Sequence, residues 1–211
     1  MSALHLSILP AAQRALWDEL AAVPEQFVLY GGTAIALQLG HRQSVDFDFF
    51  ARRDIDAQDL IEHLPLLAQC EPLQMEPNTL TVRVWRQDPI LLSFFGVPRL
   101  PSLRPPLAEE GAPVRLGDLL ELGGMKALVI QKRAEAKDYL DVHALLTRAR
   151  ISLSEMLAAA KALYAPSFTP EITLKSLCYF EDGNLATVPE AVRRDLARAV
   201  RAVDPRKLPV L

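Results

Sequence analysis

The chain has 211 residues, of which half are hydrophobic and 23% are charged, and its formal net charge is −3. This composition is typical of a globular protein of one or two small domains, and it excludes a chain that is basic over its whole surface. The sequence has no apolar run of membrane-spanning length and no secretion signal, and its two distant cysteines, Cys70 and Cys178, lack metal-ligand spacing. We therefore expect a cytoplasmic protein with no membrane partner and with buried, reduced thiols.

The first part of the chain alternates between helical and extended patterns. Pro10 precedes a run with apolar side chains at helical spacing, and two later apolar runs are short enough to be buried strands. Gly40 is placed to end the second helix, because glycine readily takes the left-handed conformation found there. The predicted elements are a helix over 11–23, a strand over 27–30, a helix over 33–39 and a strand over 45–50.

Two features of this segment indicate a site for a nucleoside triphosphate with Mg²⁺. Asp46 and Asp48 alternate along a strand, so their side chains share one face with Cα atoms about 6.5 Å apart, and both can bind one hard divalent cation. The glycine pair Gly31-Gly32 lies between a strand and a helix start, where backbone N–H groups can approach an anion. A tight turn beside a solvent-exposed strand is the alternative interpretation of the same residues.

The next elements predict a hairpin in the same sheet as the aspartate pair. Asp56 can cap a helix over 57–69, which Pro65 should kink or shorten. Apolar and polar residues alternate over 79–86, and a second strand is predicted over 90–97, after a turn at Asp88-Pro89. Prolines then crowd residues 98–113, which indicates an extended loop. We predict a sheet core over 1–100, a linker or loop over 101–113 and a helical part over 114–211.

The helical part carries two further charged motifs. Asp118 can cap a helix that runs through Lys126 to about Arg133, and Gly123-Gly124 inside it mark the close approach of another element. Lys137-Asp138-Tyr139-Leu140-Asp141 opens the next helix, on which Asp138 and Asp141 share a face. Lys137 is four residues before Asp141 and can pair with it on the surface. Later helices are predicted over 155–164, 171–180 and 190–203.

Together these patterns predict an α+β (α/β) fold, with a small mixed β-sheet core flanked by helices and followed by a C-terminal helical part. The chain resembles nucleotidyltransferases of the AbiEii/AbiGii toxin type, within the polymerase-β-like minimal nucleotidyltransferase superfamily. The resemblance covers roughly residues 25–150. It rests on Gly31-Gly32-Thr33-Ala34, on Arg42-x-Ser44-x-Asp46-x-Asp48, and on Lys126 followed by the Lys137-Asp138-x-x-Asp141 motif.

The resemblance implies a role for each of these residues. Asp46 and Asp48 would hold Mg²⁺, and Gly31, Gly32 and the Thr33 hydroxyl would cradle the β- and γ-phosphates of an NTP. Lys126, with Arg42, would neutralise triphosphate charge, and Asp138 would orient or deprotonate the attacking hydroxyl. Ser44, Lys137 and Asp141 would have supporting roles. The product would be an acceptor carrying NMP, with RNA or tRNA as the expected acceptor and a cognate antitoxin protein as the expected partner.

One departure from the superfamily pattern leaves alternatives open. Many of its members place a third carboxylate on the strand beside the aspartate pair, and this sequence has Ser93 at the expected place. A binding module of the same fold, impaired in catalysis, is therefore one alternative, and a transferase acting on a small molecule such as an antibiotic is another. A surface for RNA would have to be local, and residues 189–211, with six basic and three acidic side chains, are the candidate.

Overall fold

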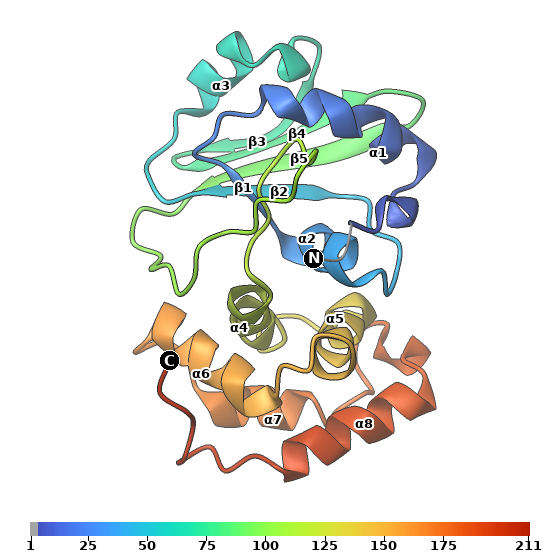
Figure 1. Ribbon diagram of the computed structural model, residues 1–211, viewed down its shortest axis with the longest axis vertical. Helices are drawn as coiled ribbons and strands as arrows, with labels where there is room; N and C mark the ends of the chain where they lie inside the picture. The colour runs from blue at the N-terminus through green and yellow to red at the C-terminus, as the bar shows by residue number, and fades with distance from the viewer. Residues whose placement is uncertain (1–3) are drawn as a thin grey trace. The chain divides into compact units, whose positions relative to one another are not determined.

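The computed structural model describes residues 4–211, which form two compact units (Figure 1). Unit 1 contains the described residues up to Leu100 together with Pro105–Gly117, and unit 2 contains Pro101–Arg104 and Asp118–Leu211. Residues 105–117 belong to unit 1 because Leu116 bridges to β1 of its sheet. The predicted linker over 101–113 is thus divided between the units. Residues 1–3 lie outside the described part. They belong to the N-terminal segment in which we expect no secretion signal.

Unit 1 is built on a small mixed sheet, as the sequence predicts, and the sheet has five strands. Its strands, in chain order, are β1 (Val28–Tyr30), β2 (Phe47–Ala51), β3 (Glu71–Glu76), β4 (Thr79–Trp85) and β5 (Pro89–Gly96). Their order across the sheet is β1-β2-β5-β4-β3. The β2–β5 pair is parallel and the other pairs are antiparallel, so the predicted β4–β5 hairpin does lie in the same sheet as the aspartate strand.

One face of this sheet is the core of unit 1. Phe47 and Phe49 point into it and are fully buried, and Phe49 stacks on Phe94 of β5 with ring centroids 5.2 Å apart. Trp17, from the N-terminal helical segment, contacts Phe47 on the same face. Because side chains alternate along a strand, Asp48 between the two phenylalanines belongs to the opposite face. The period-two pattern of this strand therefore separates a core face from a polar face.

Short helices cover both faces of the sheet. The helical segments of unit 1 are η1 (Leu6–Ile8), α1 (Ala11–Leu16), η2 (Trp17–Ala22), α2 (Gly31–Leu39), α3 (Ala57–His63) and η3 (Pro65–Leu67), where η marks a 3₁₀-helix. In Figure 1, α1 and α3 lie on one side of the sheet and α2 on the other. The predicted helix over 11–23 is thus an α-helix that continues as a 3₁₀-helix.

Two helices of unit 1 follow their predicted caps closely. Asp56 accepts hydrogen bonds from the backbone N–H groups of Gln58 and Asp59 and so caps α3. Pro65 shortens that helix, which ends at His63 instead of the predicted residue 69. Gly40 ends α2 with a φ of +61°, which is the left-handed backbone conformation expected of the glycine that follows an α-helix.

β3 is a strand that the sequence analysis does not predict. All six of its residues are exposed, so it shows no alternation between buried and exposed positions. It is an edge strand, held by pairing to β4 alone in the described sheet, with an irregular register between Pro72 and Gln74. Periodicity fails here because neither face of the strand packs on a core.

Unit 2 is helical. Its helices are α4 (Leu119–Val129), α5 (Ala136–Thr147), α6 (Leu153–Tyr164), α7 (Pro170–Ser176), η4 (Leu185–Thr187) and α8 (Glu190–Arg201). Asp118 caps α4 through the backbone N–H groups of Leu120 and Glu121, and Ser152 forms a reciprocal capping box with Glu155 at the start of α6. The predicted helices are present, although α4, α7 and α8 each end two to four residues early.

The glycine pair in α4 lies where the sequence predicts a close approach. A Cβ at Gly124 would be 2.8 Å from the backbone nitrogen of Ala160, and a Cβ at Gly123 would be 2.9 Å from the Met156 side chain. Both neighbours belong to α6, against which α4 packs. The two glycines therefore let α4 and α6 pack with their backbones unusually close.

Two remaining expectations concern thiols and membranes. Both cysteines are free, but Cys70 is only partly buried and Cys178 is exposed, so the prediction of buried thiols is wrong. Within residues 4–211, no helix has the length and apolar character needed to cross a bilayer.

Candidate functional site

The glycine turn and the aspartate strand meet in unit 1. Tyr30, the last residue of β1, pairs with Asp48 in the antiparallel β1–β2 ladder, which brings the next residue, Gly31, beside the Asp48 side chain. Gly31 has a φ of +69°, and a Cβ there would overlap the Asp48 carboxylate. Glycine is thus required at this position both for its backbone conformation and for the close approach of α2 to the acid.

The segment that carries Asp46 is held against α2 by buried side chains. The Thr33 hydroxyl is hydrogen-bonded to Ser44 Oγ, at 2.7 Å, and to the backbone carbonyl of Asp46. Gln13 Nε2 donates to the Val45 carbonyl at 3.0 Å from the other side. The Thr33 hydroxyl, which the family resemblance assigns to a phosphate, is therefore buried and engaged within the protein. In this structure Thr33 and Ser44 position Asp46.

The two acids lie at the start of β2 on the polar side of the sheet. Asp46 immediately precedes the strand and Asp48 is its second residue, and both are partly buried. Their carboxylate oxygens are hard donors of the kind that Mg²⁺ prefers, and Mg²⁺ commonly binds to only one or two carboxylates together with substrate phosphates. The pair therefore fits such an ion. Among residues 4–211, no group of three or more His, Cys, Asp or Glu side chains could hold a metal.

Ser93 occupies the place on β5 directly beside Asp48. In the parallel β2–β5 ladder Asp48 is the register partner of Ser93, and in the β4–β5 ladder Ser93 faces Thr81. The Thr81 hydroxyl donates to Ser93 Oγ at a long 3.4 Å. The position at which the superfamily pattern expects a third carboxylate is therefore filled by a hydroxyl.

A second charged cluster lies within unit 2, between α4 and α5. Lys126 Nζ is 2.6 Å from Asp138 Oδ1 and 2.7 Å from Asp141 Oδ2, and both carboxylates are fully buried. The Lys126 side chain is itself only 7% exposed. Arg133 adds a forked contact to Asp138, with Nε 2.8 Å from Oδ2 and Nη2 3.1 Å from Oδ1. Two cations and two anions thus form one compact network.

This network makes Asp138 a weak base. Burial by itself raises the pKa of Asp138, but hydrogen bonding to Arg133 and the positive charge of Lys126 oppose it, and the net pKa lies below its ordinary value. A carboxylate with a lowered pKa binds a proton poorly at neutral pH. In this arrangement Asp138 is better suited to hold Lys126 and Arg133 in place than to remove a proton.

The sequence analysis is wrong about one ion pair near this cluster, that of Lys137 with Asp141, and it does not predict that Arg133 belongs to the cluster. Lys137 does not pair with Asp141 on the surface, because Asp141 faces inward to Lys126 and Lys137 lies 3.0 Å from Glu135. Arg133 was not predicted as a partner of Asp138. Its contact depends on the turn between α4 and α5, and helical spacing carries no signal for a pair across a turn.

The remaining predicted basic residues lie at the surface. Arg42 is partly buried and donates to the Gln43 carbonyl at 2.8 Å. On α8, Arg194, Arg198 and Arg201 are exposed and spaced by four and three residues, so they form a stripe along one side of the helix. Arg193 points elsewhere, packing over the Phe180 ring with its guanidinium 5.1 Å from the ring centre. The basic segment singled out from the sequence thus includes an arginine stripe on α8.

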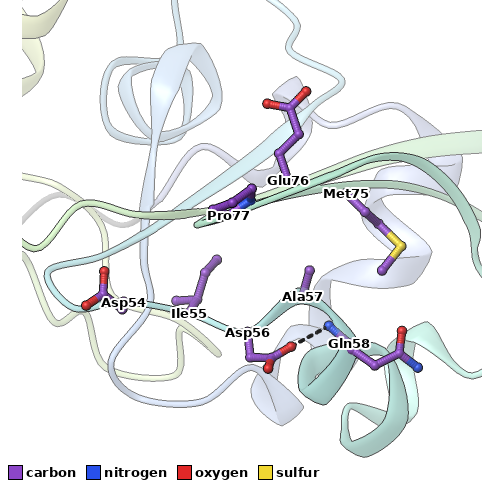
Figure 2. A pocket seen from close by; sticks show the side chains of 8 residues that line it. All are labelled: Asp54, Ile55, Asp56, Ala57, Gln58, Met75, Glu76 and Pro77. Carbon is purple, nitrogen blue, oxygen red and sulfur yellow. Dashed lines mark hydrogen bonds between the residues drawn. The ribbon is translucent and has the colours of Figure 1, made fainter.

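A hollow of about 620 Å³ lies elsewhere in unit 1, between the start of α3 and the end of β3. Figure 2 shows its lining, which includes Asp54, Asp56, Met75 and Glu76. The Asp56 side chain is already used to cap α3. None of the predicted site residues lines this hollow, and we assign it no function.

Comparison with known proteins identifies a family and related chains. A family profile described as "Nucleotidyl transferase AbiEii toxin, Type IV TA system" matches residues 14–208. An uncharacterized protein of Aquifex aeolicus is 32% identical over 158 residues, which cover 74% of each chain.

Two solved structures are also similar. A crystal structure described as "putative nucleotidyltransferase from H. pylori" superposes with a TM-score of 0.55 at 19% identity, covering 90% of each chain. This likeness supports the fold over the part of the chain that superposes. The nucleotidyltransferase toxin MenT4 of Mycobacterium tuberculosis gives a TM-score of 0.43 at 18% identity, over 87% of this chain and 89% of the other.

Proposed function

Because the chain belongs to the AbiEii family of nucleotidyltransferase toxins, we propose that it transfers NMP from an NTP to a hydroxyl group of RNA, with tRNA as the expected acceptor. The observation that carries the proposal is the convergence of Gly31 and Asp48. The turn proposed to bind phosphate and the carboxylate proposed to bind the metal are in direct packing contact, although they come from different elements. This is the combination that binding of a metal–triphosphate complex requires.

Each part of the unit 1 site has a chemical task in this proposal. Asp46 and Asp48 hold Mg²⁺, which when bound stabilises negative charge that develops on the transferred phosphoryl group. The backbone N–H groups of Gly31 and Gly32, the first two residues of α2, bind phosphate oxygens. Thr33 and Ser44 keep Asp46 in position through their buried hydrogen bonds.

Lys126 in the unit 2 cluster carries the positive charge that the family motif assigns to the triphosphate. Lys126 is proposed to stabilise the triphosphate, as the family motif implies, while Asp138 and Asp141 hold its ammonium group in one orientation. Asp138 then acts mainly as a positioning residue, in place of the general base suggested by the resemblance.

The reaction follows from these roles. The acceptor hydroxyl oxygen attacks the α-phosphorus of the NTP and forms the new P–O bond. The bond from the α-phosphorus to the bridging oxygen breaks, pyrophosphate leaves with the electron pair, and the hydroxyl proton passes to solvent. In a cell this modification of RNA would make the protein toxic, and a cognate antitoxin would counteract it.

A labelling experiment tests the proposal. Purified protein is incubated with Mg²⁺, each α-labelled NTP in turn and total bacterial RNA, beside an Asp48→Ala variant whose folding is checked by circular dichroism. Label in RNA with the unaltered protein alone would establish transfer and identify the base. Equal labelling by the variant would remove Asp48 from the metal-binding role.

A binding module of the same fold is the second candidate, and Ser93 favours it, because the site lacks a carboxylate at that position. Such a protein would bind an NTP with Mg²⁺ but form no product. Binding of each NTP is therefore measured beside the labelling assay. Tight binding without label in RNA, for all four nucleotides, would favour the binding module.

A further inference from the structure

The row of side chains that continues across the sheet from Asp48 contains no further acid. Ser93 on β5 is the register partner of Asp48, Thr81 on β4 is the partner of Ser93, and Gln74 on β3 is the partner of Thr81. Register partners on adjacent strands point to the same face of a sheet, about 4.8 Å apart. The two positions nearest Asp48 in this row therefore carry only hydroxyl groups.

Burial along β5 agrees with this placement. Leu92 and Phe94, on either side of Ser93, are fully buried in the core face, so Ser93 belongs to the face that carries Asp48. On the other side of Asp48 its register partner on β1 is Tyr30, which is not an acid, and the next residue, Gly31, has no side chain. A carboxylate at position 93 would be the one best placed to join Asp46 and Asp48 around a cation.

We infer that Ser93 determines how the site acquires its metal, an inference that rests on the proposed function. The protein without nucleotide binds Mg²⁺ weakly and takes up the ion together with the triphosphate. Two carboxylates supply two negative charges and few of the six oxygens that Mg²⁺ requires, and phosphate oxygens supply further ligands and charge. Binding of metal and of triphosphate is then mutually dependent, since each raises the affinity for the other by the same factor.

The full-length protein tests this directly, with Mn²⁺ as a spectroscopically visible substitute for Mg²⁺ and a non-hydrolysable NTP analogue. Calorimetry compares binding of Mn²⁺ alone, of the analogue with chelator, and of the preformed Mn²⁺–analogue complex. We expect the complex to bind at least about tenfold more tightly than either component alone. Equally tight binding of Mn²⁺ with and without the analogue would overturn the inference.

Three variants isolate the contribution of position 93. Ser93→Asp is expected to raise the affinity for Mn²⁺ alone by about tenfold or more, because it adds a third charged ligand beside Asp48. Ser93→Asn has nearly the same size without charge and should give no gain. Thr81→Asp adds the same charge two strands from Asp48, about 9.6 Å away, and should also give no gain.

The outcomes separate the inference from the proposed function. A folded Ser93→Asp variant, verified by thermal unfolding, that binds Mn²⁺ no better than the unaltered protein would contradict the inference. If Ser93→Asp does not fold, the comparison of Mn²⁺ alone with the Mn²⁺–analogue complex still decides it. The proposed function fails on a different result, namely an Asp48→Ala variant that keeps full metal-dependent binding of the analogue.

Discussion

Gly31 shows how a single residue can be constrained from two directions. Its left-handed backbone disfavours any residue with a side chain, and the Asp48 carboxylate fills the space where a Cβ would lie. Gly111 has a similar φ of +77°, yet nothing lies within 4 Å of the position its Cβ would take. Both glycines therefore have a backbone conformation that other residues rarely adopt, but of the two only Gly31 also lacks space for a Cβ.

This difference makes Gly111→Ala a matched control for Gly31→Ala. Gly111→Ala should lower the free energy of unfolding by about 1–2 kcal/mol, the typical cost of a left-handed non-glycine residue, and leave nucleotidyl transfer unchanged. Gly31→Ala should be less stable still and should lose transfer, because Asp48 must move. Urea unfolding and the RNA-labelling assay measure the two effects. Full transfer by Gly31→Ala would show that Asp48 does not need its present position.

Arg133 is expected to influence stability at acidic pH. The pKa of Asp138 is lowered in the folded protein, so its contribution to stability is present above the pKa of an unfolded aspartate, about 3.9, and is lost as pH falls through the folded value. Arg133→Gln removes a forked contact to Asp138, raises that folded pKa and should make acid unfolding begin at higher pH. Acid titration followed by circular dichroism checks this.

Arg83 offers a control for this substitution. It forms an ion pair at 2.6 Å with Glu71, on the exposed β3–β4 edge of unit 1, and does not contact Asp138. Arg83→Gln removes the same charge from the chain, so a general effect of net charge would shift both variants alike. Identical acid-unfolding curves for Arg133→Gln and the unaltered protein would show that Lys126 alone maintains the charge of Asp138.

Among the elements, α4, the helix that carries Lys126, packs closely against α6. Gly124 lies against the backbone of Ala159 and Ala160, whereas Gly123 lies against the side chain of Met156. A backbone neighbour cannot move out of the way without shifting a helix, but a methionine side chain can change rotamer. The two positions should therefore respond differently to the same added methyl group.

Substitution of each glycine by alanine tests this expectation. Alanine favours a helix over glycine by about 1 kcal/mol, and overpacking of a tight contact costs about 1–3 kcal/mol. Gly124→Ala should therefore be net destabilising, while Gly123→Ala should be close to neutral. Thermal or urea unfolding gives both values, and equal stabilities would mean that α4 and α6 can separate slightly without loss.

At the scale of the whole molecule, a net charge of −3 requires any RNA surface to be local. The exposed stripe of Arg194, Arg198 and Arg201 on α8 is the local basic surface that we expect RNA to contact. Replacing all three by Gln should weaken RNA binding and reduce the slope of log affinity against log salt by about 2, since each contact to single-stranded RNA contributes about 0.7. Filter binding at several salt concentrations measures both quantities.

A variant with the same change in charge but at scattered positions is the control. Arg14, Arg99 and Lys161 are exposed and lie on separate segments, so together they form no stripe. Replacing these three by Gln should leave the salt slope nearly unchanged. If both triple variants lose affinity equally, RNA would respond to overall charge and the α8 stripe would have no special role.

Local patterns were sufficient for much of the fold. The alternation that places Phe47 and Phe49 on the core face also places Asp48 on the other, and capping residues such as Asp56 and Asp118 mark helix starts correctly. These features depend on neighbours within a few positions, so the sequence displays them directly. β3 was missed because an edge strand exposed on all sides has no such periodicity.

The sequence by itself determined which residue types are present for chemistry: the glycine turn, the two aspartates, the lysine and the Lys-Asp-x-x-Asp motif. Tertiary structure decided which of them touch. Strand register places Ser93 beside Asp48, and the packing of α4 on α5 turns Asp141 inward to Lys126 and away from Lys137. The physical reason is that register and helix packing are fixed by the burial of many side chains together, so contacts between distant segments cannot be read from local spacing.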